Sequence, residues 1–333
     1  MNEFELITRY FKRAQSQHPR LVLGVGDDGA LLQPAAGMQL VVSTDTLVSG
    51  VHFFADVAPA HLGHKALAVN LSDMAAMGAQ PIAFTLALTL PQIDEAWLAE
   101  FSRGLWALAD AHGCALIGGD TTRGPLAISI TVLGELPVGA ALLRSGAKAG
   151  EGIYVSGTAT DCIGQARAGL ALALAQGNAR MGQLDMADAA HAAARLELPS
   201  PRVALGIALR GLASSCLDLS DGLVGDLQHI LQASQVGAIL DLPALQQLAQ
   251  QRPVLCNLNA QAQERCMLSG GDDYELLFTV PDQAVAALRE VTAASGTVLT
   301  CIGRTQAALA LQCKSAEGQL LALPDYKAWQ HFD

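Results

Sequence analysis

Six short segments of this chain place Asp beside Gly, Ser or Thr, and most of them lie between apolar runs. They are residues 26–29 (GDDG), 43–46 (STDT), 70–73 (NLSD), 118–121 (GGDT), 218–222 (DLSDG) and 270–273 (GGDD). Their carboxylates are expected to project from the ends of buried elements. Carboxylates around one cleft repel each other unless cations neutralise them, and hard oxygen ligands without a His or Cys cluster favour Mg²⁺. The sequence predicts a magnesium-rich phosphate site.

Composition limits the class of protein. A length of 333 residues predicts two domains, and 51% hydrophobic residues allow large cores. The formal net charge of −11 argues against a nucleic-acid partner. Seven scattered cysteines without a C-x-x-C pair favour reduced thiols and a cytoplasmic location. The N-terminus is amphipathic rather than a signal peptide, and we expect no membrane span, since no segment offers roughly 20 uninterrupted apolar residues.

The N-terminal half alternates predicted strands and helices. We expect buried strands at residues 21–23 and 40–43, further strands at 82–90, 115–118 and 128–136, and helices at 59–77 and 95–112. Pro59 suits a first helical turn, and Gly78 and Gly113 suit helix ends. This order predicts an α/β (α+β) domain, with helices on one face of a mixed or antiparallel sheet.

A glycine-rich, charged stretch at residues 144–152 marks the expected domain boundary. We therefore divide the chain into an N-terminal domain, 1–146, and a C-terminal α/β domain, 147–333. In the second domain we expect strands near 153–156, 216–219 and 275–280, and helices at 166–175, 185–196, 203–213 and 223–233.

Residues 24–29 formally match the dinucleotide-binding pattern G-x-G-x-x-G. We reject that interpretation because two carboxylates in the loop would repel a pyrophosphate, and Pro34 shortens the helix that should follow. The loop is either an ordinary acidic turn or a metal-binding turn in which Asp28 bridges and Asp27 assists.

Asp73 is the most informative single residue. It lies in an Ala-, Met- and Leu-rich helical run, where an unpaired buried carboxylate is costly. It either bonds locally or faces a cation, and we favour the cation. Asp45 follows a predicted strand, where a strand-end Asx turn is an equal alternative until the other carboxylates are considered with it.

Two further acidic segments combine carboxylates with phosphate-binding chemistry. The paired glycines at 118–119 allow the backbone to approach a phosphate, and no P-loop sequence occurs. Ser220 precedes a predicted helix, so it is either the N-cap or part of an anion site next to metal-binding carboxylates. Arg144 is either a phosphate clamp or a solvated side chain. His52 and Trp329 are by default packed side chains.

Taken together, these segments resemble the thiamine-monophosphate kinase family, over nearly the whole chain. Residues 43–53, 65–73 and 116–122 carry the most specific part of the resemblance. The resemblance implies the two-domain fold of an ATP-using superfamily that includes aminoimidazole ribonucleotide synthetase, in a homodimer whose N-terminal sheets pair. It implies that the domain 1–146 binds ATP and Mg²⁺ and dimerises, and that the domain 147–333 completes the active site. It also implies that ATP phosphorylates thiamine monophosphate to thiamine diphosphate, the last step of that biosynthesis. The transfer is direct and in line, with several Mg²⁺ ions and no dedicated catalytic base.

The resemblance also implies roles for individual residues. The implied magnesium ligands are Asp28, Ser43, Thr44, Asp45, Asp73, Asp120, Asp218 and Asp221. The implied ATP contacts are Gly119, Asp120, Arg144, Ser220 and His112. The implied thiamine monophosphate contacts are His52, Asp272 and Trp329. The chain departs from the family at Asp272, where Glu is usual, and in its C-terminal tail at residues 328–332.

Three other functions compete with this interpretation. The first is another ATP-dependent enzyme of the same superfamily, similar to aminoimidazole ribonucleotide synthetase. Superfamily members with a reactive thiol are disfavoured, because no cysteine precedes Cys114 and none ends the chain. The second is a non-catalytic regulator that binds magnesium and nucleotide, and carboxylates in both halves argue against it. The third, a calcium module, lacks EF-hand spacing.

Overall fold

The computed structural model describes residues 3–13, 18–175 and 186–323. Its contacts divide the chain into two compact units. The first comprises Met1–Met74 and Ala79–Ala141, and the second comprises Ala75–Gly78 and Leu142–Asp333. The change between units after residue 141 lies five residues before the boundary expected from the glycine-rich stretch. The functional roles assigned to the two domains stay predictions.

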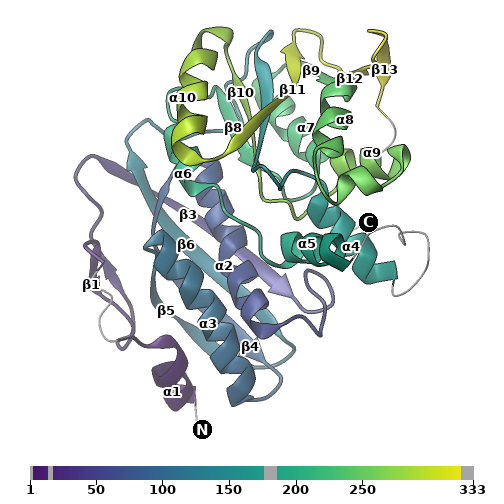
Figure 1. Cartoon of the computed structure of the whole chain (residues 1–333). Helices are drawn as coiled ribbons and strands as arrows, with labels where there is room; N and C mark the ends of the chain where they lie inside the picture. The colour runs from purple at the N-terminus through teal and green to yellow at the C-terminus, as the bar shows by residue number, and fades with distance from the viewer. Residues whose placement is uncertain (1–2, 14–17, 176–185, 324–333) are drawn as a thin grey trace. The chain divides into compact units, whose positions relative to one another are not determined.

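The first unit is built on a four-stranded sheet, as Figure 1 shows. Its strands lie in the order β3 (Met38–Val48), β6 (Ala127–Pro137), β4 (Gln80–Leu90) and β5 (Ala115–Arg123). The β3–β6 and β6–β4 pairs are antiparallel and β4–β5 is parallel. Helices α2 (Pro59–Ala76) and α3 (Glu95–His112) cover one face of the sheet. The predicted mixed sheet with helices on one face is confirmed.

Helices α2 and α3 pack with their backbones unusually close. A Cβ atom on Gly104 would lie 1.9 Å from the Ala60 carbonyl oxygen, and one on Gly63 would lie 2.1 Å from the Phe101 carbonyl oxygen. Only glycine fits at these two positions. The α3 bounds follow from local signals: the Asp94 side chain accepts hydrogen bonds from two backbone N–H groups of the first turn, and Gly113 ends the helix with φ of 60°.

The N-terminal segment adds two small pieces to the first unit. Helix α1 (Glu3–Leu6) continues into a π-helical turn, Ile7–Phe11, which is held to α3 by a 2.9 Å hydrogen bond from the Trp106 indole to the Tyr10 carbonyl. Strands β1 (Leu21–Leu23) and β2 (Leu31–Leu32) form a hairpin. Apolar side chains of this hairpin pack on a buried cluster of β4 and β5 that includes Ile82 and Ile117.

The expected burial of the strands at 21–23 and 40–43 is wrong. Val22 is 63% exposed and Val42 is 59% exposed. The hairpin packs through one side only, and β3 is an edge strand whose second face carries no helix. Apolar strand residues therefore remain accessible on the open face of the sheet.

The second unit contains a seven-stranded sheet in the order β13-β12-β9-β11-β7-β10-β8. The strands are β7 (Gly152–Gly157), β8 (Ser215–Asp218), β9 (Gly237–Asp241), β10 (Leu276–Val280), β11 (Val298–Gln306), β12 (Leu311–Lys314) and β13 (Leu320–Ala322). The β12–β9 pair is parallel and the other pairs are antiparallel.

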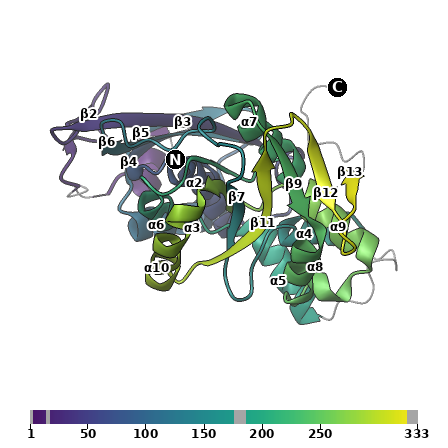
Figure 2. The ribbon, with the colours of Figure 1, turned by 90° about the horizontal axis from the view of Figure 1, so that it is seen from above.

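Helices lie on both sides of this second sheet. They are α4 (Gln165–Ala175), α5 (Met186–Glu197), α6 (Val203–Ala208), α7 (Leu223–Ser234), α8 (Leu242–Gln250), α9 (Ala260–Ser269) and α10 (Val285–Ser295), with single 3₁₀ turns at Leu255–Asn257 and Asp282–Ala284. Figure 2 shows α6 and α10 on one side of β7 and β11, and α4, α5, α8 and α9 on the other. The helix expected over 203–213 is too long, because α6 ends at Ala208 and a turn follows, in which Gly211 has φ of 74°.

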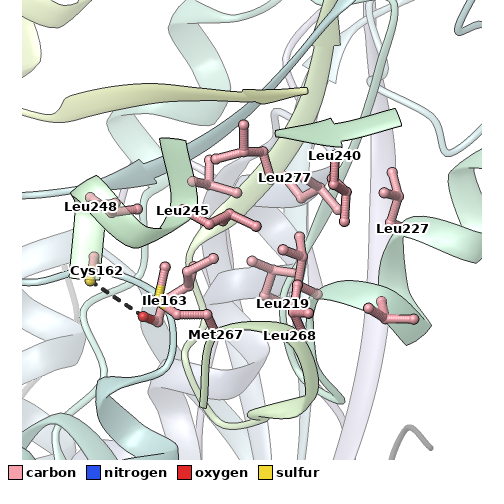
Figure 3. Packing of buried hydrophobic residues seen from close by; sticks show 14 of the residues in the cluster. Cys162, Ile163, Leu219, Leu227, Leu240, Leu245, Leu248, Met267, Leu268 and Leu277 are labelled. Carbon is pink, nitrogen blue, oxygen red and sulfur yellow. Dashed lines mark hydrogen bonds between the residues drawn. The ribbon is translucent and has the colours of Figure 1, made fainter. Parts of the chain in front are cut away.

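The main core of the second unit lies between its sheet and these helices. Figure 3 shows Leu227, Leu245, Leu248, Met267 and Leu277 of β10 as members of one buried cluster. Leu219, within the acidic segment 218–222, and Leu268, two residues before the segment 270–273, are part of the same cluster. Both acidic segments are therefore anchored in the core by a neighbouring leucine. In the ranges that the structure describes, no helix combines the length and hydropathy needed to cross a bilayer.

Candidate active site

Two carboxylates from different elements meet in the first unit. Ser43 and Asp45 project from β3 toward α2, and the Ser43 hydroxyl donates a 2.5 Å hydrogen bond to Asp73 Oδ2 on that helix. Burial raises the pKa of Asp45, and the neighbouring Asp73 carboxylate raises that pKa further, to about 7. Such a pair shares a proton or a cation.

The intervening residue, Thr44, projects from the opposite face of β3. Its hydroxyl lies 2.8 Å from that of Thr131, and the Thr46 hydroxyl lies 2.7 Å from that of Ser129. These pairs form a row of hydroxyl groups on the open face of the sheet. The structure therefore does not bring the Thr44 side chain to the Asp45–Asp73 pair, because alternate strand residues point to opposite faces.

Register separates Asp120 from that pair in the same way. Gly119 pairs with Leu86 in the row that contains Asp45, whereas Asp120 pairs with Ala87 in the row that contains Thr46. Gly119 has φ of 151°, and a Cβ atom there would lie 1.9 Å from the Leu86 carbonyl oxygen. Gly119 is expected to let the backbone approach a phosphate, and in the structure it lets the backbone of β5 approach that of β4.

Asp28 lies in the exposed turn between β1 and β2. Its backbone N–H donates to Asp27 Oδ1 at 2.9 Å, so Asp27 organises the turn locally. Among the described residues, no group of three or more His, Cys, Asp or Glu side chains is close enough to hold a metal ion by itself.

The Asp45–Asp73 pair nevertheless has the donor chemistry of a magnesium site. Mg²⁺ is usually held by one or two carboxylates, with waters and substrate phosphates completing its octahedron. Two carboxylates and the Ser43 hydroxyl supply hard oxygen donors, and the pKa of Asp45 is raised by burial and by repulsion from Asp73, a repulsion that a bound cation would relieve. The side chains present fit Mg²⁺ on these grounds.

Two histidines predicted to contact ligands have defined surroundings in the first unit. The Val48 N–H donates to His52 Nδ1 at 3.0 Å, so the proton of the neutral ring lies on Nε2. Burial lowers the pKa of His112, in the last turn of α3, and the charge of His64 on α2 lowers it further. His112 is accordingly neutral at physiological pH.

In the second unit, the segment 218–222 connects β8 to α7. Of the two alternatives considered for Ser220, the structure excludes the N-cap, because α7 begins after Gly222, whose φ is 116°. The three N–H groups of Ser220, Asp221 and Gly222 instead donate to Asp226 Oδ2 at 3.0–3.1 Å. Burial is the main cause that raises the pKa of Asp226 to about 6.

Asp226 is a residue that sequence reasoning missed. An acidic residue in the first helical turn is a recognised signal, but it does not indicate that one oxygen collects three N–H groups. The anion expected at this helix start is therefore a carboxylate of the chain itself.

The segment 270–274 lies directly on 218–222. The Asp272 N–H donates to the Ser220 carbonyl at 2.9 Å, and the Tyr274 N–H donates to the Leu219 carbonyl at 2.8 Å. Asp272 and Tyr274 both have left-handed backbones, with φ of 64° and 51°. Non-glycine residues adopt this conformation at a cost and often do so at functional sites.

Glu275, which directly follows the segment 270–274, is the centre of a cluster of charged side chains that was not predicted from the sequence. Glu275, fully buried, accepts from Arg202 Nη2 at 2.5 Å, from Arg195 Nη2 at 3.2 Å and from the Ser156 hydroxyl at 2.5 Å. Arg195 also donates to the Asp273 carbonyl at 3.2 Å. Burial raises the pKa of the Asp273 carboxyl group to about 8. Spacing does not indicate which arginines of a helix are buried, so no sequence signal identified them.

The remaining predicted residues are less informative. Arg144 is exposed, and its carbonyl accepts a 3.2 Å hydrogen bond from the Ser234 hydroxyl. Trp329 lies outside the described residues.

Comparison with known proteins agrees with this architecture. Residues 26–136 match the family model for AIR synthase related protein, N-terminal domain, and residues 148–314 match that for its C-terminal domain. The two-domain fold is thus that of an AIR synthase related protein.

More similar relatives narrow this class. Thiamine-monophosphate kinase of Escherichia coli (strain K12) is 48% identical, covering 99% of this chain and 98% of that protein. The crystal structure of thiamine-monophosphate kinase from Stenotrophomonas maltophilia K279a is 43% identical, with a TM-score of 0.80 and coverage of 91% and 93%. This chain belongs to the thiamine-monophosphate kinase family. A structure of AaThiL complexed with AMPPCP and TMP is 26% identical, with a TM-score of 0.72 and coverage of 99% and 96%.

Proposed function

We propose that this chain transfers the γ-phosphoryl group of ATP to the phosphate of thiamine monophosphate, which gives thiamine diphosphate and ADP. Membership of the thiamine-monophosphate kinase family supports the reaction, as does the AaThiL structure, a relative complexed with AMPPCP and TMP. The observation in this chain that carries the proposal is the Asp45–Asp73 pair, whose partly buried like charges call for a cation beside β3 and α2.

In this reaction a phosphate oxygen of thiamine monophosphate forms a bond to the γ-phosphorus. The bond from that phosphorus to the β–γ bridging oxygen breaks, and ADP leaves with the electron pair. The acceptor oxygen is already ionised at neutral pH, so no side chain has to remove a proton. Catalysis then consists of positioning two anions in line and neutralising their charge.

Asp45, Asp73 and Ser43 would hold Mg²⁺ in the first unit. Mg²⁺ held there would supply positive charge that offsets the negative charge of the phosphates. We assign further metal contacts to Asp28, Thr44 and Asp120 in the first unit, and to Asp218 and Asp221 in the second. These contacts would form together with the bound phosphates.

Other residues would contact the two substrates. We assign ATP to Gly119, Asp120, Arg144, Ser220 and His112, and thiamine monophosphate to His52, Asp272 and Trp329. His52 is suited to donate from Nε2, because its Nδ1 is already engaged by the Val48 N–H. Asp272 is shorter than the usual Glu of the family, so its reach to the substrate is reduced.

Two statements on the cellular form complete the proposal. We propose a homodimer in which the open face of the first unit's sheet pairs with a second copy, and the exposed Leu40 and Val42 support this. We also propose a cytoplasmic location, where ATP is available.

A product assay tests the proposed reaction. Purified protein is incubated with Mg-ATP and thiamine monophosphate, and the products are identified by mass spectrometry. We expect thiamine diphosphate and ADP in equal amounts, and neither after addition of EDTA. ADP without thiamine diphosphate would assign the acceptor to another substrate of the superfamily. No turnover of either substrate would contradict the kinase assignment.

Substitution of the carboxylate pair tests the metal site. We expect Asp45→Asn and Asp73→Asn each to lower kcat by about 100-fold or more, because each removes charge that neutralises the transferring phosphoryl group. Asp110→Asn is the matched control, since Asp110 pairs with Arg13 on the exposed side of α3. Circular dichroism checks that all three variants fold. Near-normal turnover in both pair variants would exclude this metal site.

A further inference from the structure

Asp226, in the first turn of α7, accepts hydrogen bonds from the backbone of the acidic loop 218–222. One carboxylate oxygen of this buried residue accepts hydrogen bonds from the consecutive N–H groups of Ser220, Asp221 and Gly222. Hydrogen bonds to an ionised carboxylate are stronger than neutral ones. The N–H groups face the start of α7, where the helix dipole also favours negative charge. The side chain therefore fixes the direction of three successive peptide planes.

The same loop fixes its neighbour. The Ser220 and Leu219 carbonyls accept from the N–H groups of Asp272 and Tyr274, which hold left-handed conformations. Glycines permit the contact: a Cβ atom on Gly271 would lie 2.4 Å from the Ser220 carbonyl oxygen, and one on Gly222 would lie 2.9 Å from the Ser269 carbonyl carbon. The two loops are one hydrogen-bonded body, and displacement of the first also moves the second.

We infer that Asp226 is a positioning residue that sets the geometry of both acidic loops at once. The inference rests on the proposed function, in which Asp218, Ser220 and Asp221 face metal and ATP, and Asp272 faces thiamine monophosphate. Asp226 is buried and its Oδ2 already accepts three N–H groups, so it acts on these ligands through the loops. It occupies the N–H groups that a phosphate would otherwise use, so the loop meets a phosphate through its side chains and cations rather than through this helix start.

The test compares Asp226→Ala and Asp226→Asn with the wild-type protein. We expect Asp226→Ala to raise the Mg²⁺ concentration for half-maximal activity, together with KM for ATP and KM for thiamine monophosphate, by about 10- to 100-fold, as is typical when a residue that orients metal ligands is lost. Asp226→Asn keeps an acceptor oxygen, so its shifts should be smaller. Joint movement of both substrate constants is specific to positioning of both loops.

Asp241→Ala provides a matched control in the same unit. Asp241 is the N-cap of α8 and accepts from the Ala244 N–H at 3.2 Å, outside the two loops. We expect this variant to lose thermal stability while keeping wild-type constants. If Asp226→Ala and Asp241→Ala behave alike at a temperature well below both melting points, the inference is wrong. If Asp226→Ala does not fold, Asp226→Asn decides alone. A half-maximal Mg²⁺ concentration and KM values equal to those of the wild-type protein would then overturn the inference.

Failure of the proposed function would be visible separately. If the wild-type protein forms no thiamine diphosphate, titration calorimetry with Mg-ATP on the same variants replaces the kinetic constants. A weaker Mg-ATP affinity in Asp226→Ala, but not in Asp241→Ala, would still support the inference. Equal affinities would overturn it.

Discussion

At the scale of single residues, the Asp45–Asp73 pair opposes folding in order to serve a ligand. The folded-state pKa of Asp45, about 7, lies above its ordinary value of 3.8. The folded state therefore holds the Asp45 proton more tightly than the unfolded state does. This contribution to stability is complete below about pH 4 and is lost as the pH rises through 7.

Asp45→Asn should therefore stabilise the protein at high pH when no divalent ion is present. In EDTA at pH 8 we expect the free energy of unfolding to rise by about 1–3 kcal/mol, because the buried like charge is removed. At pH 4 the two proteins should melt at nearly the same temperature. Differential scanning fluorimetry at both pH values measures the effect, and an equal difference at both would show that Asp45 titrates normally.

The residues of the site also show where sequence reasoning succeeds. Ser43, Asp45 and Asp73 are expected in one site, and the structure brings them together. The expected position of Asp45 at a strand end is wrong, because Ser43 and Asp45 lie within β3 and face Asp73 in the last turn of α2. Asp226, Arg195 and Arg202 were missed. Their roles depend on partners distant in sequence or on the direction of backbone N–H groups, and neither is encoded in a local pattern.

At the scale of elements, local signals fix helices better than strands. The bounds expected for α3 are those observed, since Asp94 and Gly113 are strong helix-end signals. Strand β3 was expected over four residues and covers eleven, because pairing with β6 extends it beyond its apolar run. Helix α6 is shorter than expected, because a turn takes the place of the last residues of the predicted helix.

The α2–α3 contact gives a prediction at this scale. Gly→Ala within a helix normally stabilises it by about 1 kcal/mol, but Gly104→Ala would place a methyl group against the Ala60 carbonyl. We expect a loss of about 1–3 kcal/mol instead, the usual cost of overpacking. Urea unfolding at equilibrium measures the change, and a stabilised variant would show that the two helices separate at little cost.

At the scale of the whole molecule, each unit has its own sheet and buried residues, and the proposed site residues come from both. The open face of the first sheet has a hydroxyl row flanked by exposed apolar residues of β3. A face of this kind is suited to contact a second copy, which is the form the proposed function assigns to the protein.

Val42→Asp tests that assembly. A charge buried in an interface without a partner costs several kcal/mol, so we expect the variant to be a monomer by light scattering at micromolar concentration, with reduced turnover. Leu309→Asp is the control, since Leu309 is 74% exposed in the second unit. A Val42→Asp protein with wild-type mass would place the contact on another surface.

Strand β3 also bears on how this chain accommodates sequence change. A strand at a protein surface usually tolerates replacement at every second position, because one of its faces has no partner. Along β3 the inward side chains Ser43 and Asp45 serve the carboxylate pair, and the outward Thr44 and Thr46 form the hydroxyl row. A slip of one residue would exchange these faces. In saturation mutagenesis, we therefore expect substitutions at consecutive positions of β3 to reduce activity, without the usual alternation. A single-residue insertion in β3 should abolish activity.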